Sequence, residues 1–227
     1  MTIFQTFKDF LKIGSKEDLI KKCGPFIEES KGLPLYRGYG MKMSAALHGQ
    51  REVTVRKDRK PRDTSIEIHN IMNAYFFKKF GVNVRSEGLF AIGDIKRASS
   101  YGHPHYVLPV GKFKYVWAEW NGKPVHDTLA ATWAIKDAMW LKPAADQERL
   151  ALKALDEFTW HSTDLPRAIK SHAEIALLCD KAIIIPVGDI PYSEIIGVQA
   201  DDAGGAQDDD RSDNTSVGSG RKSLVKK

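Results

Sequence analysis

The spacing of hydrophobic residues along this chain changes several times between a helical period and strict alternation. Within residues 1–30 apolar positions recur at helical spacing, and Ser15 with Asp18 forms a capping pair before the second of two expected helices. We expect Pro25 to kink or end that second helix, because proline lacks the amide hydrogen that a helix interior needs. Residues 33–38 then indicate a short strand that runs into a glycine turn.

The clearest helix lies between two segments of strand character. Residues 51–56 alternate arginine and valine, which is typical of a half-exposed strand. Thr64 and Glu67 then have the spacing of a capping box, and the apolar face that follows stops at Gly81. We therefore expect a long amphipathic helix before a β-rich region that covers residues 82–126.

That β-rich region contains three expected strands, at residues 88–91, 105–110 and 112–120. A hairpin turn is indicated at Asn121-Gly122, and only residues 94–101 have helical character.

The remainder of the chain returns to helices and then to strands. Asp127 is placed to cap a helix through Trp140, and two further helices are expected at residues 146–160 and 164–170. Three apolar runs predict closing strands, at residues 174–179, 182–187 and 194–198. This order predicts an α+β fold, with a mostly antiparallel β-sheet core and flanking helices.

Composition divides the chain into a body and a tail. Residues 1–198 have the apolar content of one domain, whereas residues 199–227 are rich in Asp, Gly and Ser, and we expect that tail to be disordered. The chain has 227 residues, of which 42% are hydrophobic, but no apolar run approaches the roughly 18 residues of a membrane span. The start lacks the apolar run of a signal peptide, so we expect a soluble, cytoplasmic protein with no membrane partner.

The cysteines and the net charge bear on which kinds of site and partner the protein has. Cys23 and Cys179 lie far apart among apolar neighbours, so we expect buried thiols and neither a disulfide framework nor a metal site. The net charge of +5 suggests an anionic partner, and a dinucleotide phosphate, a nucleic acid or an acidic protein would satisfy it equally well.

The segment Gly88 to Gly102 (GLFAIGDIKRASSYG) is the first that suggests a binding site. A strand, a tight turn and a short helix with small residues and one aromatic side chain would form one wall of a pocket for a flat ring. This segment resembles the nicotinamide pocket of the ADP-ribosyltransferase superfamily, in its poly-ADP-ribose polymerase branch. The resemblance implies NAD as co-substrate, without a metal, and a pocket formed by Gly88, Phe90, Ala91, Ser99 and Tyr101.

A second segment, PLYRGYG at residues 34–40, lies before this pocket in the chain. A guanidinium group pairs bidentately with phosphate, and glycine permits a dinucleotide to approach the backbone. The segment resembles the first strand of the arginine-type ADP-ribosyltransferases. The resemblance implies that Arg37 and Gly38 bind the phosphates and ribose of NAD.

The third segment begins at Glu174, which heads an apolar strand. It resembles the catalytic element of the same superfamily, in which a glutamate at the start of a late strand stabilises the oxocarbenium-like sugar as the glycosidic bond breaks. The resemblance implies that Glu174 is the catalytic residue and that ADP-ribose passes to a macromolecular acceptor, most naturally a protein. Glu119 and Glu87 are the alternative carboxylates for this role.

Two departures from the superfamily pattern bear on the mechanism. Arginine-type members carry Ser-Thr-Ser on the middle strand, where this chain has Ala91-Ile92-Gly93, so the hydroxyl that orients the glutamate is unassigned. His172 occupies the position two residues before Glu174 that guides the acceptor in toxin-like members, so the acceptor cannot be carried over.

Other functions stay open from the sequence. An NAD glycohydrolase, or a degenerate NAD-binding domain without chemistry, would use the same pocket. Phe113, Tyr115 and Trp117 alternate with basic residues, which would suit a non-enzymatic nucleic-acid-binding or structural protein. His103 and His105 are weak candidates for zinc. The small size of the chain is compatible with an intracellular effector of phage or bacterial origin.

Overall fold

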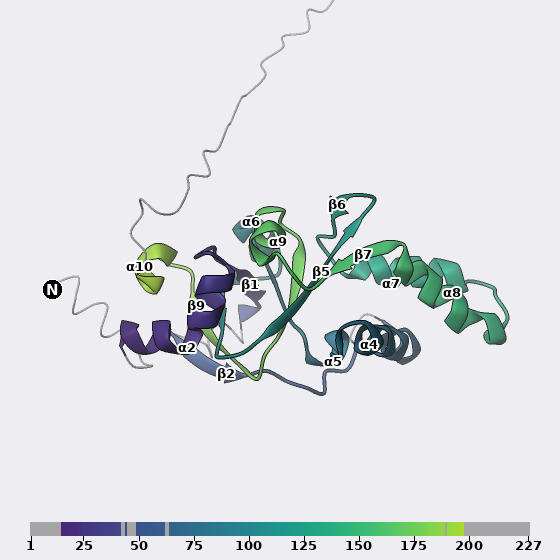
Figure 1. Ribbon diagram of the computed structural model, residues 1–227, viewed down its shortest axis with the longest axis horizontal. Coiled ribbons are helices and arrows are strands. Elements are labelled where there is room, and N and C mark those ends of the chain that lie inside the picture. Colours follow the sequence, from purple (N-terminus) through teal and green to yellow (C-terminus); the bar gives the residue numbers. More distant parts are fainter. Residues whose placement is uncertain (1–14, 42–43, 45–48, 62–63, 189, 198–227) are drawn as a thin grey trace, which may run out of the picture.

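A single sheet with helices on both faces organises the protein (Figure 1). The structure, a computed structural model, describes residues 15–41, 44, 49–61, 64–188 and 190–197. The first of the two expected N-terminal helices and the tail from residue 199 lie outside the described residues.

The described strands form one nine-stranded sheet. They are β1 (Tyr36–Tyr39), β2 (Arg51–Thr54), β3 (Leu89–Ile92), β4 (His103–Pro109), β5 (Lys114–Trp120), β6 (Lys123–Pro124), β7 (Phe158–His161), β8 (Glu174–Leu178) and β9 (Lys181–Pro186). Their order across the sheet is β2-β9-β4-β1-β3-β8-β5-β6, with β7 paired to β5. Every pair is antiparallel, which confirms the expected α+β fold and its mostly antiparallel core.

The described helices lie between these strands in the chain. They are α2 (Lys16–Glu29), α4 (Ile66–Phe80), α5 (Val84–Glu87), α6 (Ile95–Ser100), α7 (Leu129–Met139), α8 (Ala144–Asp156), α9 (Leu165–Lys170) and α10 (Tyr192–Ile196). The short helix α5 is not indicated by the sequence pattern. Helices α7 and α8 pack against each other and lie together at one end of the molecule (Figure 1).

The sheet buries a hydrophobic core on each face because side chains alternate along its strands. In β8, Ile175 and Leu177 belong to the core that α2, α9 and α10 cover. Ala176 and Leu178 belong to the opposite core, beneath α4, α7 and α8. A central strand buried on both faces explains why residues 174–179 are an almost continuous apolar run.

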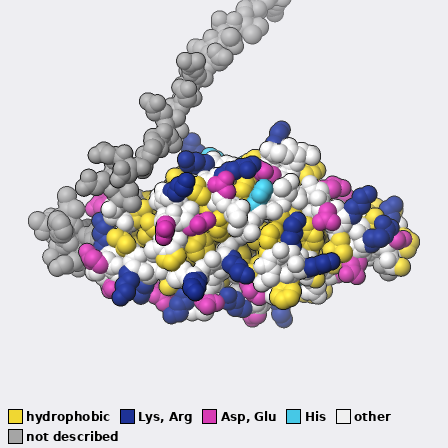
Figure 2. Space-filling view, in the orientation of Figure 1, with side chains coloured by type: hydrophobic (Ala, Val, Ile, Leu, Met, Phe, Trp, Pro, Cys, Tyr) yellow, Lys and Arg dark blue, Asp and Glu magenta, His cyan; other side chains and the backbone are white. Residues whose placement is uncertain are grey.

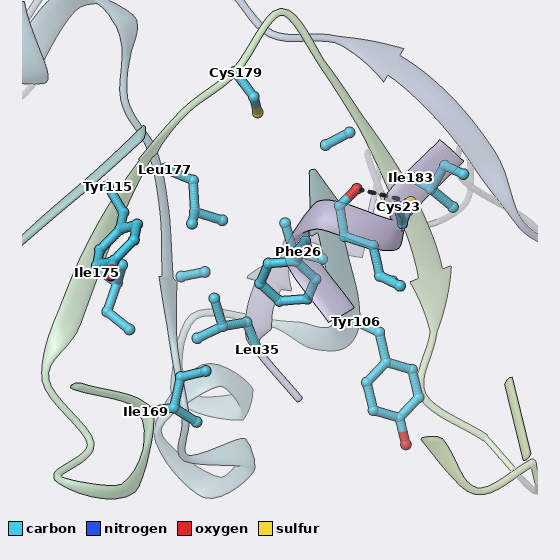
Figure 3. Packing of buried hydrophobic residues seen from close by; sticks show 14 of the residues in the cluster. Cys23, Phe26, Leu35, Tyr106, Tyr115, Ile169, Ile175, Leu177, Cys179 and Ile183 are labelled. Carbon is cyan, nitrogen blue, oxygen red and sulfur yellow. Dashed lines mark hydrogen bonds between the residues drawn. The ribbon is translucent and has the colours of Figure 1, made fainter. Parts of the chain in front are cut away.

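The expected buried thiols lie in the first of these cores (Figure 3). Cys23 packs near Phe26, and its Sγ donates to the carbonyl of Leu108 at 3.8 Å. Burial raises the pKa of Cys23 to about 12 and that of Cys179 to about 11. Both side chains therefore act as small core residues at neutral pH.

Two expected elements differ in type from those in the structure. Residues 158–160, expected as the end of a helix, belong to strand β7, because Phe158 and Trp160 bury alternate side chains where the strand pairs with β5. The expected strand at residues 194–198 is instead helix α10, which starts after Pro191 and ends at Gly197 with φ +79°. The buried residues Ile195 and Ile196 fit a helix packed on α2 as well as they fit a strand.

The helix caps differ from expectation in detail. Helix α4 begins after Ser65, whose hydroxyl accepts from the amide of Ile68, and not after Thr64. Helix α2 does not end at Pro25 and continues to Glu29. The carbonyl of Lys22, three residues before the proline, accepts from the amide of Gly111 at 2.8 Å, which ties the helix to the segment after β4.

Among the described residues, no helix is both long enough and apolar enough to cross a membrane.

Candidate functional site

A cleft of about 520 Å³ opens where β1, β3 and β8 meet the end of α6 and the start of α7. This volume lies within the usual range of small-molecule sites. Five residues that the sequence associates with NAD line it together with the predicted catalytic Glu174, and they are Arg37, Gly38, Phe90, Ala91 and Tyr101. Positions far apart in the chain therefore meet in one place.

Strand pairing accounts for much of this convergence. Strand β3 pairs with both β1 and β8, with Tyr36 opposite Ile92 and Ile92 opposite Glu174. The side chain of Arg37 crosses from β1 and donates to the carbonyl of Phe90 at 2.5 Å. Its Nε is buried and has no partner among the described residues.

Gly38 allows helix α6 to approach the strand that carries Arg37. A Cβ at position 38 would lie 2.1 Å from the carbonyl oxygen of Ala98 and 2.9 Å from the Cβ of Tyr101. Only a residue without a side chain fits there. This close packing places Tyr101, at the end of α6, over the cleft with 64% of its surface exposed.

Two of the predicted pocket residues do not line the cleft. The hydroxyl of Ser99 donates to the carbonyl of Ile95 within its own helix and faces solvent. Gly88 is buried beneath the site, where a Cβ would lie 2.4 Å from the carbonyl oxygen of Val84. Gly88 therefore contributes through its own carbonyl, which accepts from Arg59, and not through contact with the cleft.

Glu174 lies at the centre of the site and is partly buried. Its Oε2 accepts from the amide of Thr128, the residue before α7, at 2.8 Å. Burial raises the pKa of Glu174, the amide and hydroxyl of Thr128 lower it, Asp127 raises it and Arg85 lowers it. A desolvated carboxylate held by hydrogen bonds is typical of a functional group rather than of a solvated strand end.

A second carboxylate, that of Asp127, lines the same cleft. Its Oδ1 accepts from the amide of Leu129 at 2.8 Å, and its Oδ2 accepts from the hydroxyl of Tyr101 at 3.4 Å. The expected cap at Asp127 is therefore present as a hydrogen bond, although Thr128 is the residue that directly precedes the helix.

Three guanidinium groups meet in the cleft, and we call Arg37, Arg59 and Arg85 the arginine cluster. Among the described residues, none of the three has a carboxylate oxygen within 4.0 Å. Burial and then the charges of Arg37 and Arg85 lower the pKa of Arg59. The cleft also contains the carboxylates of Glu174 and Asp127, but its positive charges outnumber them, which favours binding of an anion.

Two members of the arginine cluster lie over the aromatic ring of Phe90. The guanidinium carbons of Arg59 and Arg85 lie 5.4 Å and 5.6 Å from the centroid of that ring. Arg59 also donates to the carbonyl of Gly88. Phe90 therefore lines the cleft and also packs against two of its arginines.

The sequence does not single out Arg59, Arg85, Thr128 or Asp127 as parts of one site. Arg59 lies in a run of basic residues that has the appearance of a solvated loop, and Arg85 belongs to the unexpected helix α5. Asp127 and Thr128 have the sequence pattern of a helix start, and this pattern gives no indication that they also line a cleft. The sequence sets Arg85 apart only by its apolar neighbour Val84, and one such neighbour does not indicate a binding residue.

The alternative carboxylates lie outside the cleft. Glu119 binds Arg167 at 2.5 Å and His161 at 3.2 Å. Glu87 accepts from Asn83 within α5 at 2.8 Å. Neither group is placed to act on a ligand bound beside Glu174.

Two histidines that the sequence singled out, His172 and His105, both lie outside the cleft. His172 does not line the cleft; it is exposed, has φ +60°, and its Nδ1 lies 3.8 Å from a carboxylate oxygen of Asp94. His105 is buried, its Nδ1 donates to the carbonyl of His103 at 2.9 Å, and burial lowers its pKa. Within the part of the chain that the structure describes, no group of three or more His, Cys, Asp or Glu residues could hold a metal ion.

The aromatic strand proposed for nucleic-acid stacking is mostly buried. Tyr115 and Trp117 are 6% and 1% exposed, and Phe113 packs against the same core. Figure 2 shows Lys and Arg side chains intermixed with Asp and Glu over the face it presents, without a continuous basic stripe there. Side chains in the core cannot stack on bases, so that basis for nucleic-acid binding is removed.

Comparison of the chain with models of known protein families, with curated protein sequences and with solved structures found no match.

Proposed function

We propose that this protein transfers ADP-ribose from NAD to a macromolecular acceptor, with release of nicotinamide, and that the acceptor is a protein. One observation carries the proposal. Arg37, Ala91, Tyr101 and Glu174, singled out separately in the sequence, lie on β1, β3, α6 and β8 and line one cleft.

The charges of the cleft suit this co-substrate. Four cationic side chains line it, those of the arginine cluster and Lys60, and they face the carboxylates of Glu174 and Asp127. The formal surplus is 4 − 2 = +2, which the two negative charges of a diphosphate would neutralise.

The uncharged part of the cleft suits a nicotinamide ring. Ala91 is small and buried in the wall, and Tyr101 exposes much of its ring above it. An aromatic face available to solvent gains by stacking on a flat ring. Ser99 takes no part in this pocket, so the match to the sequence pattern is partial.

The reaction follows from a carboxylate fixed beside a sugar. The bond between the anomeric carbon and the nicotinamide nitrogen breaks, and nicotinamide leaves with the bonding electrons. The anionic form of Glu174 stabilises the positive charge on the ribose, and the acceptor then bonds to the anomeric carbon and loses a proton. Since burial raises the pKa of Glu174, turnover should fall as the pH drops through that pKa.

The test is nicotinamide release from NAD by the purified protein, with and without cell lysate as a source of acceptor. Glu174→Gln should lose on the order of 10²-fold or more of the rate, the size expected for a group that acts on transition-state charge. Arg37→Ala should chiefly raise KM. Glu119→Gln, a change of the same chemistry outside the cleft, is the matched control and should keep most of the rate.

The results separate the competing functions. Label from NAD that appears in a protein band of the lysate supports transfer, and release without any labelled band supports an NAD glycohydrolase. Binding of NAD without release supports a degenerate domain. If NAD neither binds nor turns over, or if Glu119→Gln loses as much activity as Glu174→Gln, the assignment of Glu174 is wrong.

A further inference from the structure

The carboxylate of Asp127 lies beside that of Glu174, and hydrogen bonds to the backbone account for this placement. The amide of Glu174 donates to the carbonyl of Val125 at 2.9 Å, and His126 Nδ1 donates to the carbonyl of His172 at 2.7 Å. The segment before α7 therefore runs along the start of β8. Both carboxylates line the cleft.

Successive amides at the start of α7 hold the two carboxylates. The amide of Thr128 donates to Glu174 Oε2 at 2.8 Å, and the amide of Leu129 donates to Asp127 Oδ1 at 2.8 Å. Burial and, after it, the charge of Asp127 raise the pKa of Glu174, as expected for neighbouring carboxylates. The two groups are therefore fixed next to each other at one helix start.

The second oxygen of Asp127 is only weakly engaged. Its partner among the described residues is the hydroxyl of Tyr101, at 3.4 Å, which is long for a hydrogen bond between oxygens. Within the described part of the chain, no Lys, Arg or His nitrogen lies within 4.0 Å of the Asp127 carboxylate. Since the side chain is partly exposed and a carboxylate oxygen can accept about two hydrogen bonds, Asp127 Oδ2 can accept from a group that enters the cleft.

The transfer reaction makes two demands that one carboxylate cannot meet at the same time. Negative charge must stay beside the sugar while the bond to nicotinamide breaks. A proton must also leave the group that attacks the anomeric carbon. If Glu174 took that proton, it would lose the charge that stabilises the sugar, so a second carboxylate next to it allows the two tasks to be divided.

We propose that Asp127 is a second catalytic residue, which takes the proton of the attacking group while Glu174 keeps its negative charge. The proposal rests on the transferase function proposed above. An O–H or N–H group of the ADP-ribose acceptor donates to Asp127 Oδ2, and its oxygen or nitrogen bonds to the anomeric carbon. Nicotinamide leaves with the electrons of the broken bond, and the proton passes to Asp127 and then to water.

Azide separates this role from a structural one, because the azide anion bonds to the anomeric carbon without a proton to lose. The purified protein is incubated with NAD and sodium azide, and ADP-ribosyl azide and ADP-ribose are quantified by mass spectrometry. Water must lose a proton to give ADP-ribose. With lysate present, labelled protein is counted together with ADP-ribose, because its attacking groups also lose a proton. The ratio of the azide product to the others therefore reports proton removal, whereas a structural defect lowers all products together.

We expect Asp127→Asn to raise this ratio by about 10-fold to 100-fold. Its amide oxygen can still accept from Leu129, so the start of α7 is kept. Glu174→Gln should lower all products and leave the ratio within about threefold of wild type. Asp164→Asn is the matched control and should change neither, because Asp164 lies outside the cleft and also accepts from a helix-start amide, that of Arg167 at 3.2 Å.

The outcomes distinguish this proposal from the transferase function. If wild type releases no nicotinamide in buffer, in azide or with lysate, the transferase function fails and the role of Asp127 fails with it. If wild type turns NAD over but Asp127→Asn leaves the ratio unchanged, or Glu174→Gln raises it instead, only the role of Asp127 is wrong. Asp127→Ser, whose hydroxyl can also accept at a helix start, should give the same rise and replaces Asp127→Asn should that variant not fold.

Discussion

Single residues set the shape of the cleft before any of them meets a ligand. Gly38 shows this most directly, because the carbonyl of Ala98 and the side chain of Tyr101 occupy the space that a Cβ would need. The glycine has no chemistry of its own, yet the distance between Arg37 and Tyr101 depends on it.

Gly38→Ala should therefore destabilise the protein. The added methyl group would have to move helix α6 away from β1, and overpacking of this kind costs about 1–3 kcal/mol in the free energy of unfolding. Gly40→Ala is the control, because a Cβ there has no atom within 4 Å. Urea denaturation of the two variants gives the comparison, and equal stabilities would contradict the close packing.

The sequence predicted the site residues that lie in a local sequence pattern, and it did not predict those that reach the cleft only through tertiary contacts. Arg37 stands beside Gly38, and Glu174 heads an apolar strand, so both carry a local pattern. Arg59 and Thr128 reach the cleft through tertiary contacts with Gly88 and Glu174, which no local pattern records. Ser99 matched a pattern but faces solvent, because the register of a short helix is poorly defined by six residues.

At the scale of the elements, α2 contains a proline that the helix accommodates at a cost. Pro25 cannot donate to the carbonyl one turn before it, and interior proline is less favourable than alanine by about 3 kcal/mol. The buried residues Cys23 and Phe26 on either side keep the helix docked. Tertiary packing here outweighs the local preference that predicted an earlier end.

Pro25→Ala should therefore stabilise the protein. The regained helical hydrogen bond exceeds the entropy that the unfolded chain recovers when proline is lost, and we expect a net gain of about 1–2 kcal/mol. Pro166→Ala is the control, because Pro166 lies in the first turn of α9, where proline is tolerated. The Tm values of both variants are measured by thermal unfolding. A lower Tm for Pro25→Ala than for wild type would contradict the predicted stabilisation.

Most elements followed from the sequence, and the errors have a common physical cause. The strands β4 and β5 and the helix α4 are the long elements, and each carries a regular pattern of hydrophobic residues. Residues 158–161 and 192–196 are too short for their period to separate helix from strand. Their type is decided by the neighbours on which they pack, β5 and α2.

At the scale of the whole molecule, the net charge is +5, and part of the positive charge is gathered at one site. Three of its arginines meet in one cleft without a carboxylate partner among the described residues. This arrangement lowers the stability of the free protein and favours an anion-bound state.

Inorganic pyrophosphate should therefore raise the Tm of the wild-type protein. At about 100 times its Kd a ligand adds roughly 2.7 kcal/mol, or on the order of 5–10 °C for a domain of this size. The double variant Arg59→Met with Arg85→Met should lose most of this shift without a lower Tm in the absence of ligand, since repulsion is relieved. Arg149→Met, on the exposed face of α8, should keep the full shift. An equal shift in all three proteins would place the anion elsewhere.

The two kinds of charge in the cleft are anchored very differently. Glu174 begins a strand whose next four residues are buried at the centre of the sheet, whereas Arg59 lies on the connection between β2 and α4. Apart from Val55, no described residue of that connection belongs to either hydrophobic core, whereas residues 175–178 of β8 belong to the two cores. Over evolutionary time, the part of the positive charge that Arg59 and Lys60 supply is therefore freer to change than Glu174 is.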